Sequence, residues 1–354
     1  MMTNTGSSTP VTLAARATAA LAAGVLSTTV MAGCSSDAKP KTAPSASTPA
    51  STTVAPTRPP IARVAATNPL TGVGSPPAGP VIAVKIDDTS GGRPSLGLEK
   101  ADVIYIEEVE GGLTRMVAVF ASSKPKVRAV RSVRRSDPEL LAQYGRIILV
   151  ASGGAGASLH ALDASTLHGV IMDRGQVGFY RDHSRPAPYN VVSDLAKVSK
   201  AVKAAGVRNV GFRWAALAPQ LARARSATVV STRVGSTMVG FVWDSKLRRY
   251  FRTIDGRRIA TARGARVAKP NVLVQFCQVR PDHSDVDVNG NPSMYTKSVG
   301  SGRVVLFRNG KRIEGRWSRR SLGAPTVFRD SSGRPLLLAP GGTFVALARP
   351  GAPV

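Results

Sequence analysis

Acidic residues cluster where two predicted strands end, and their spacing could support acid–base chemistry. The run ADVIYIEEVE (101–110) reads as a strand, whose alternation would place Glu108 and Glu110 on one face, about 6.5–7 Å apart. That separation is near the one seen for two carboxyl groups that flank a glycosidic bond with room for a water molecule. Asp88, at the end of the predicted strand 81–87, could join them. The alternative is that these acids form ion pairs with arginines, which is the commoner arrangement.

A row of arginines offers a second kind of chemistry. The run VRAVRSVRR (127–135) lies just upstream of a predicted helix start, where backbone N–H groups are also free to bind an anion. A guanidinium group can bind two oxygens of one carboxylate or phosphate at the same time. The candidate ligand-binding arginines are Arg115, Arg128, Arg131 and Arg134. The pattern therefore indicates an anion site. The alternative is an internal network with Glu108, Glu110 and Asp137.

The stretch FYRDHSRPAPYN (179–190) combines aromatic, charged and amide side chains. Its prolines exclude a regular strand ladder, so we expect a loop, and loops on a rigid scaffold often carry binding residues. In this interpretation Tyr180 stacks on a sugar or ring, Arg181 and Asp182 hold the loop, and Arg185 and Asn190 bind a ligand. The alternative is a loop that only docks two domains against each other.

The N-terminus indicates export. Residues 17–33 are small and apolar, carry no charge and follow Arg16, as in a secretory signal peptide. They end in VMAGC (30–34), which resembles a bacterial lipobox. The resemblance implies that residues 1–33 are removed and that Cys34 carries a lipid, which would hold the protein on the outer face of the cytoplasmic membrane. The alternative is secretion without a lipid.

After Cys34, residues 35–67 are dominated by Ser, Thr, Ala, Pro and Lys and contain no aromatic residue, so 34–67 is expected to be a disordered tether. Cys277 is then the one cysteine left, and we expect it to be a small buried side chain. With no disulfide framework and no zinc site to build, we expect neither a metal nor a cofactor.

The charge is strongly basic. The chain has 48 Lys and Arg against 21 Asp and Glu, a formal charge of +27. Such a balance often indicates nucleic acid, but an exported protein seldom meets it, so no nucleic acid partner is expected. Anionic envelope polymers or lipid headgroups are the candidate partners, because each basic residue near an anionic membrane contributes about 1 kcal/mol. A solvated basic surface is the alternative.

The pattern of elements predicts an α+β protein of two domains. Strand runs at 81–87, 101–110, 113–121, 146–152 and 169–173 alternate with helices at 136–145, 154–163 and 193–206, which is typical of an α/β domain with a mixed sheet at 68–220. Gly111-Gly112 indicates a tight hairpin turn. From 221 to 354 the helices cease and short strand runs follow, with a hairpin signal at Asn309-Gly310, so this part is expected to be β-rich.

Several motifs in order resemble the DUF3048 family of YerB-like bacterial lipoproteins. They are NPLTG (68–72), GLEKADVIYIEEVEGGLTR (97–115), VRAVRSVRR, FYRDHSRPAPYN, VGSGRVVLFRNGKRIEGRW (299–317) and LLLAPGGTFVALA (336–348). The chain departs from the family pattern at Ile106, where an acid is frequent, and at His183. The resemblance implies an envelope lipoprotein with separate N- and C-terminal family domains and an unassigned activity.

Three functions follow from these observations. The first is a binding protein that holds an anionic or carbohydrate envelope ligand in a cleft of the N-terminal domain. The second is a hydrolase of cell-wall glycan that uses Asp88, Glu108 and Glu110. The third is a scaffold for another envelope protein. A binding protein needs arginines that are free of internal partners, a hydrolase needs convergent carboxylates with shifted pKa values in an open pocket, and a scaffold needs an exposed apolar patch.

Overall fold

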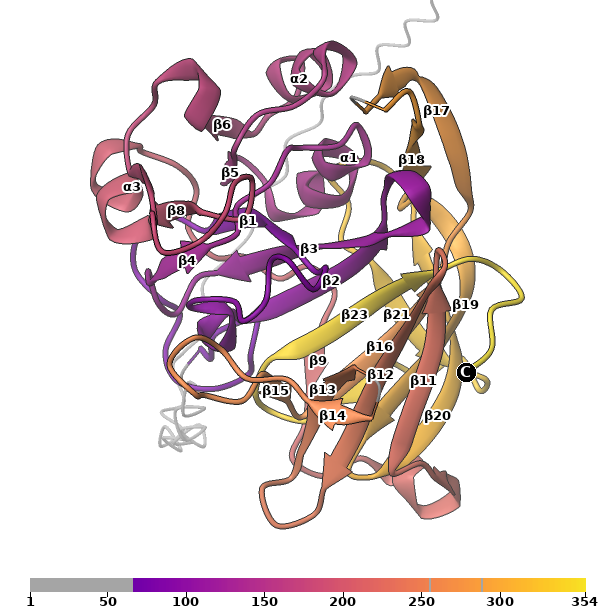
Figure 1. Cartoon of the computed structure of the whole chain (residues 1–354). Coiled ribbons are helices and arrows are strands. Elements are labelled where there is room, and N and C mark those ends of the chain that lie inside the picture. The colour runs from indigo at the N-terminus through magenta and orange to yellow at the C-terminus, as the bar shows by residue number, and fades with distance from the viewer. Residues whose placement is uncertain (1–65, 255, 288) are drawn as a thin grey trace, which may run out of the picture. The chain divides into compact units, whose positions relative to one another are not determined.

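The computed structural model describes residues 66–354, except 255 and 288. The predicted signal peptide, Cys34 and all of the predicted tether but its last two residues lie outside the described residues. From Ala62 to Val354 the chain forms one compact unit (Figure 1). Among the described residues, no helix is both long enough and apolar enough to cross a bilayer.

The helices are short. They are α1 (Ser136–Leu141), α2 (Gly156–Asp163) and α3 (Leu195–Ala201), with 3-10 turns η1 (Leu98–Lys100), η2 (Glu110–Gly112), η3 (Ala142–Tyr144), η4 (Met172–Arg174) and η5 (Pro219–Arg223). The strands before residue 220 are β1 (Ile82–Asp87), β2 (Val103–Glu108), β3 (Thr114–Phe120), β4 (Lys126–Arg128), β5 (Ile148–Ala151), β6 (His168–Ile171), β7 (Phe179–Arg181), β8 (Val191–Asp194) and β9 (Arg213–Trp214).

The rest of the chain is β-rich, as expected. Its strands are β10 (Arg225–Ser226), β11 (Val229–Val234), β12 (Thr237–Asp244), β13 (Arg249–Ile254), β14 (Arg257–Arg258), β15 (Ala268–Lys269), β16 (Asn271–Phe276), β17 (Val279–Val286), β18 (Pro292–Thr296), β19 (Gly300–Arg308), β20 (Lys311–Arg319), β21 (Val327–Asp330), β22 (Leu337–Leu338) and β23 (Thr343–Ala348).

One mixed sheet runs through both halves of the sequence. Its order is β10-β20-β19-β16-β23-β2-β3-β1-β5-β6, and β21 pairs with β20. The last strand, β23, lies between β2 of the N-terminal half and β16 of the C-terminal half, and it is parallel to both. The predicted mixed sheet is therefore confirmed, and strands from both halves form it together. The division at 220/221 stays a prediction.

Two hydrophobic cores lie on the two faces of this sheet. Successive residues of the central strands alternate between them: Ile104 belongs to one core and Tyr105 to the other. On the first face pack β11, β12 and β13, and Phe241 of β12 meets Phe344 of β23 with ring centroids 4.9 Å apart. On the second face packs α1, whose Leu140 and Leu141 are buried. A strand that is buried on both faces needs apolar residues at nearly every position, which explains why the central strands are nearly continuous apolar runs in the sequence.

Helix α3 is shorter than the predicted helix 193–206. It begins after Asp194, whose carboxylate caps it by accepting from the N–H groups of Ala196 and Lys197. It ends at Ala201: Val202 has an extended backbone, and both Val202 and Ala204 pack against the first core. Tertiary packing here outweighs helix propensity.

The sequence predicted hairpin turns at Gly111-Gly112 and at Asn309-Gly310, and both hairpins form. Asn309 and Gly310 make a two-residue turn between β19 and β20, with φ of 53° and 68°, as the Asn-Gly signal indicates. Between β2 and β3 the connection is longer than a tight Gly-Gly turn, because it runs from Val109 to Leu113 and contains the 3-10 turn η2.

The stretch 179–190 is not a loop throughout. Phe179–Arg181 forms β7, which pairs with β8, and the loop begins at Asp182. The prolines that argued against a strand stand later, at Pro186 and Pro188, so they leave the first three residues free to join a ladder.

Candidate functional site

The predicted carboxylate pair does not form. Strand β2 ends at Glu108, and Glu110 lies in the turn η2, so the alternation that would put both on one face is broken at Val109. Glu108 instead accepts two hydrogen bonds from Arg349, both of 2.7 Å, while Glu110 binds Arg115 and Arg134.

Glu110 holds two of the predicted ligand-binding arginines. Arg115 donates to its Oε1 at 2.7 Å, and Arg134 donates from Nε to its Oε2 at 2.8 Å and from Nη2 to its Oε1. Burial by itself would raise the pKa of Glu110, but the hydrogen bond from Arg134 and the two positive charges outweigh it and lower the pKa to about 2. Burial lowers the pKa of Arg115 to about 10. These arginines are internal partners of a carboxylate.

A third acid of this region, Glu107, lies in a dry cluster. It contacts Lys85, which also donates to Asp137 at 2.8 Å, and all three side chains are at most 1% exposed. Burial and the nearby charge of Asp137 raise the pKa of Glu107 to about 8. A carboxyl group with a raised pKa suits a general acid, but this one has no contact with solvent, so the cluster is structural.

Asp88, the third candidate acid, is buried and paired. Its Oδ2 accepts from Thr114 at 2.8 Å and from Arg252 at 2.8 Å. Arg252 comes from β13 in the second sheet, so this pair ties the two sheets together. Asp88, Glu108 and Glu110 therefore have separate arginine partners, an arrangement that does not resemble the convergent pair of a hydrolase.

The other two candidate arginines, Arg128 and Arg131, are also paired. Arg128 donates to Asp182 at 2.6 Å and to the carbonyl of Pro94 at 2.9 Å. Arg131 donates to Asp87 at 2.9 Å and lies over the ring of Tyr189, 5.4 Å from its centroid. The arginines that were expected to be free are thus engaged, because a guanidinium removed from water needs acceptors for its N–H groups, and here carboxylates and a carbonyl supply them.

The loop that follows β7 is held by its own side chains. Arg181 donates to Asn190 at 2.9 Å, and Arg185 donates to the backbone carbonyls of Gly91 and Arg93. Hydrogen bonds from Ser184 and then from Arg128 lower the pKa of Asp182 to about 2. The ring of Tyr180 is 44% exposed beside Lys126 and lines an open hollow of about 400 Å³. Of the predicted ligand-binding residues in this stretch, Tyr180 lines that hollow, together with its neighbour Phe179.

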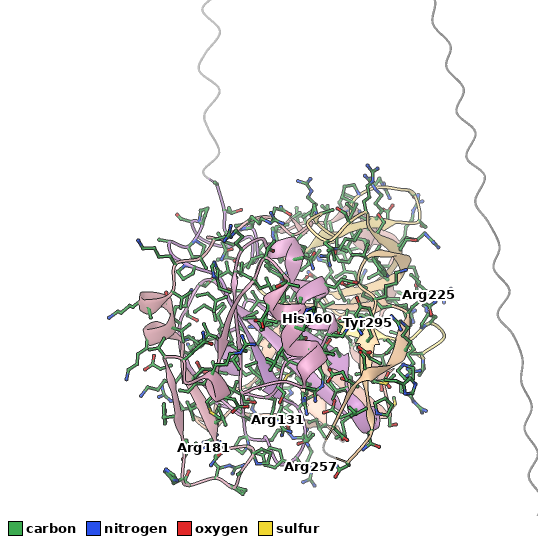
Figure 2. The ribbon with its side chains drawn as sticks, turned by 90° about the horizontal axis from the view of Figure 1, so that it is seen from above. Arg131, His160, Arg181, Arg225, Arg257 and Tyr295 are labelled. Atoms are coloured by element: carbon green, nitrogen blue, oxygen red, sulfur yellow. The ribbon has the colours of Figure 1, made fainter. Side chains whose placement is uncertain are left out.

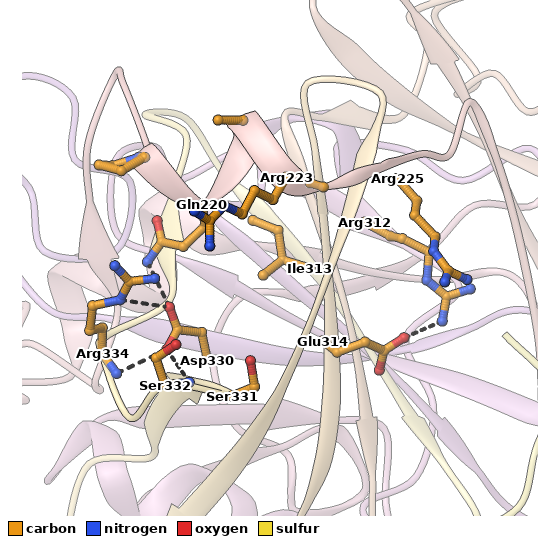
Figure 3. Close-up of a pocket in the computed structure, with 13 residues that line it drawn as sticks. Gln220, Arg223, Arg225, Arg312, Ile313, Glu314, Asp330, Ser331, Ser332 and Arg334 are labelled. Carbon is orange, nitrogen blue, oxygen red and sulfur yellow. Dashed lines mark hydrogen bonds and ion pairs between the residues drawn. The ribbon is translucent and has the colours of Figure 1, made fainter.

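A different hollow, of about 770 Å³, contains arginines without partners (Figure 3). It lies between η5, the adjoining strand β10, the start of β20 and the turn after β21. Four arginines line it: Arg223, Arg225, Arg312 and Arg334. Arg312 pairs with Glu314 and Arg334 with Asp330. Arg223 and Arg225 are exposed and form no ion pair or side-chain hydrogen bond with any residue that the structure describes.

Strand pairing forces two of these positive charges together. Arg225 of β10 stands directly opposite Arg312 of β20 in the antiparallel register. Like charges at opposite positions destabilise a strand pair, since their Cβ atoms are only about 4.5–5.5 Å apart. Glu314 offsets one of the two charges, and an anion in the hollow would offset the other.

The positive surface continues along the sheet. Arg316 of β20 stands opposite Arg303 of β19 on one side and opposite Arg329 of β21 on the other, and all three are exposed. Arg303 is paired with Glu314. We call these three residues the arginine row; its middle member, Arg316, lies on the same strand, β20, as Arg312.

Arg225 of the hollow and Arg181 of the site predicted from the sequence lie on opposite sides of the molecule in Figure 2. The sequence held a signal for the hollow in the basic runs ARARS (222–226) and NGKRIE (309–314). Only the pairing of β10 with β20 shows that they meet, and β10 is two residues long.

Comparison with known proteins places the chain in a family. The model for the N-terminal domain of the "Protein of unknown function (DUF3048)" matches residues 70–208, and the model for its C-terminal domain matches residues 229–345. The chain belongs to the DUF3048 family.

One curated relative of this DUF3048 protein is "Putative lipoprotein YerB" of Bacillus subtilis (strain 168), 28% identical over 275 residues, which are 75% of this chain and 80% of the relative. The crystal structure of YerB protein from Bacillus subtilis has the same fold, with a TM-score of 0.66 at 22% identity. That match covers 80% of this chain and 96% of the other.

Of the two matched DUF3048 regions, the C-terminal one lines the hollow and the N-terminal one does not. Arg312 and Arg334 lie within the matched C-terminal region, whereas Arg223 and Arg225 lie in the segment 209–228 that connects the two matched regions. The hollow is therefore formed where this connecting segment packs against the C-terminal DUF3048 region.

Proposed function

We propose that this DUF3048 chain, an α+β protein of two family domains, is a lipid-anchored protein of the outer face of the cytoplasmic membrane that binds an anionic envelope polymer in the hollow of Arg223, Arg225, Arg312 and Arg334. One observation carries the proposal: Arg225 faces Arg312 across a strand pair while Arg223 and Arg225 have no anionic partner among the described residues. A phosphate or carboxylate between them would relieve the repulsion and accept several N–H groups.

The same ligand chemistry was expected in the N-terminal half, with the arginines around Glu110. Those arginines are matched by internal carboxylates and mostly buried. The hollow meets the requirement for arginines free of internal partners and is open to solvent. The proposal therefore keeps the ligand class and changes the site.

The arginine row supports a polymer over a single small anion. Arg303, Arg316 and Arg329 extend the positive surface from the hollow along β19, β20 and β21. A polymer with a charge on each repeat would neutralise both the hollow and the row. The resemblance of residues 30–34 to a lipobox and the relation to a protein described as a lipoprotein support the anchored location.

The test measures binding of a labelled poly(glycerol phosphate) to the piece Ala62–Val354, which forms a compact unit. We expect the double variant Arg223→Gln and Arg225→Gln to bind at least about tenfold more weakly, because hydrogen bonds to charged groups contribute about 1.5–3 kcal/mol each when well formed. Fluorescence anisotropy at about 50 mM and about 300 mM salt separates this loss from general screening.

The matched control removes two exposed charges elsewhere, Arg146→Gln and Lys203→Gln. Equal weakening by both double variants would mean that net charge, not the hollow, holds the polymer. Unchanged binding by the Arg223 and Arg225 variant would also overturn the proposal. Competition with inorganic phosphate distinguishes a site for a polymer from a site for a single small anion. If the site holds a polymer, free phosphate should displace the labelled polymer only at a far higher concentration than unlabelled polymer does.

A further inference from the structure

Two leucines protrude at one end of the molecule. Leu217 is 86% exposed and Leu247 is 59% exposed, although both are large and apolar. Leu247 lies in the turn between β12 and β13, at the end of the molecule away from α1 and α2 (Figure 1). Leu247 and Ala216, the neighbour of Leu217, line one shallow hollow of about 340 Å³. The hollow thus brings Leu247 beside the chain that leads into Leu217, although Leu217 itself does not line it.

Both leucines are held in their exposed positions. The carboxylate of Asp244 accepts from the N–H groups of Lys246 and Leu247, at 3.1 and 3.0 Å, which fixes the turn. Buried Arg308 donates to the carbonyls of Ala215 and Ala216, at 3.1 and 2.9 Å, which fixes the backbone just before Leu217. The exposure is thus built into the fold.

Positive charges surround Leu247. Lys246, Arg248 and Arg249 are all exposed and form no ion pair with any residue in the described part of the chain. The one acid of this turn, Asp244, is already paired with Arg258 at 3.1 Å. We call Leu217, Lys246, Leu247, Arg248 and Arg249 the basic tip.

We propose that the basic tip docks on the surface of an anionic lipid bilayer. Its leucines would enter the boundary between headgroups and acyl chains, and its cations would meet the phosphate groups. This combination of apolar and basic side chains is the one that interfacial membrane contacts use.

The leucines decide between a lipid surface and a soluble polyanion. A polyanion would be held by Lys246, Arg248 and Arg249 alone and would gain nothing from two large apolar side chains. A bilayer offers both an anionic layer and an apolar layer below it. Each leucine transferred out of water contributes a favourable hydrophobic term.

The inference does not rest on the proposed function. The basic tip and the arginine hollow have different residues, so one can fail without the other. If the chain is lipid-anchored, docking of the tip would also orient the folded unit on the membrane.

Flotation of the piece Ala62–Val354 with vesicles tests the proposal. We expect binding to vesicles of phosphatidylcholine with about 30% phosphatidylglycerol and little binding to phosphatidylcholine alone. Leu217→Ser with Leu247→Ser should weaken binding to the anionic vesicles at least about tenfold. Replacing Lys246, Arg248 and Arg249 by Gln should weaken it about a hundredfold, from about fivefold for each charge.

The matched control is Leu113→Ser with Leu322→Ser, which removes two leucines that are 50% and 56% exposed outside the basic tip. Binding of the same variants to soluble poly(glycerol phosphate) is measured in parallel. If the Leu217 and Leu247 variant binds vesicles as the wild type does, or loses binding to the soluble polymer equally, the contact is only with phosphate and lipid docking is wrong.

A second measurement reads insertion directly. Leu247→Cys, labelled with a dye sensitive to polarity, should shift to the blue on anionic vesicles, whereas the same dye at Leu322→Cys should not. The native Cys277 is buried and Cys34 is absent from this piece, so labelling is specific. An unshifted dye at Leu247 during vesicle binding would overturn insertion of the tip.

Discussion

Individual charged residues show why the acids and arginines of the N-terminal half are structural. Arg115 and Arg134 are buried beside Glu110, where a guanidinium without a counterion would cost several kcal/mol. The same logic governs the dry cluster of Lys85, Glu107 and Asp137. With two acids around one lysine, charge balance is reached when one acid keeps its proton, and the raised pKa of Glu107 marks it as that acid.

A pH prediction follows for Glu107. Its pKa is raised from 4.5 to about 8 in the folded state, so the folded state binds more protons than the unfolded state between these values. The free energy of unfolding should therefore fall as pH rises from about 4.5 to about 8. In Glu107→Gln this fall should be absent, because the amide keeps the neutral form. Urea unfolding of both proteins at about pH 5.5 and about pH 8.5 measures it.

The control is Asp163→Asn, an exposed acid whose pKa is lowered by a hydrogen bond from Arg174. It titrates below this range and should leave the pH dependence of the wild type unchanged. If the Glu107→Gln protein still loses stability between the two pH values, the group that binds this proton in the folded state is not Glu107.

Among the elements, the β19–β20 hairpin positions both proposed binding surfaces. Its strand β20 carries Arg312 and Arg316, and its turn at Asn309 borders the hollow beside Leu247. The turn needs two residues with positive φ, which glycine adopts without strain. A Cβ atom added to Gly310 would also lie 2.9 Å from the ring of Trp243.

We expect Gly310→Ala to lower the free energy of unfolding by about 2 kcal/mol or more, from the left-handed backbone and the collision with Trp243. Gly333→Ala is the matched control, because Gly333 also has positive φ but a Cβ atom there meets nothing within 4 Å. It should cost only the backbone part, about 1 kcal/mol. Denaturant unfolding measures both. Equal losses in the two variants would show that the contact with Trp243 is absorbed by movement of the ring.

In the molecule as a whole, β23 joins strands that are far apart in the sequence. It supplies a parallel partner to both β2 and β16, and its residues are buried. The ion pair of Asp88 with Arg252 adds a second link between the halves. Because neither half completes its sheet alone, the two should lose their structure together.

We therefore predict one cooperative unfolding transition for the piece Ala62–Val354. Fluorescence of Trp243 and Trp317, measured with Trp214 replaced by Phe because it lies before residue 220, reports the C-terminal part. Hydrogen exchange of the amides of β1 and β5 reports the N-terminal part. The two should give the same free energy of opening, and Val345→Ala in β23 should lower both by about the same amount, roughly 1–3 kcal/mol. Opening of β1 at a distinctly lower free energy would show that the halves are independent.

Local patterns in the sequence predicted much of this protein. The Asn309-Gly310 hairpin, the β-rich C-terminal half, the mixed sheet and the burial of Cys277 depend on short-range propensity and apolar patterning, and the structure confirms them. The family resemblance was also readable from motifs in order and is confirmed by the family models. The signal peptide, the lipid on Cys34 and the tether were predicted in the same way, and they stay predictions because nearly all of these residues lie outside the described part of the chain.

Long-range pairing was beyond such patterns. Nothing local in the sequence shows that Arg225 meets Arg312, that Glu110 leaves the strand of Glu108, or that Ala216 and Leu247 line one hollow. The sequence supplied the number of charges, but which charges neutralise each other depends on which strands become neighbours. Burial then selects the outcome, because a desolvated charge requires a partner and an exposed one does not. Arg128 and Arg134 of the run 127–135 are buried beside acids, whereas Arg223 and Arg225 of the hollow stay exposed.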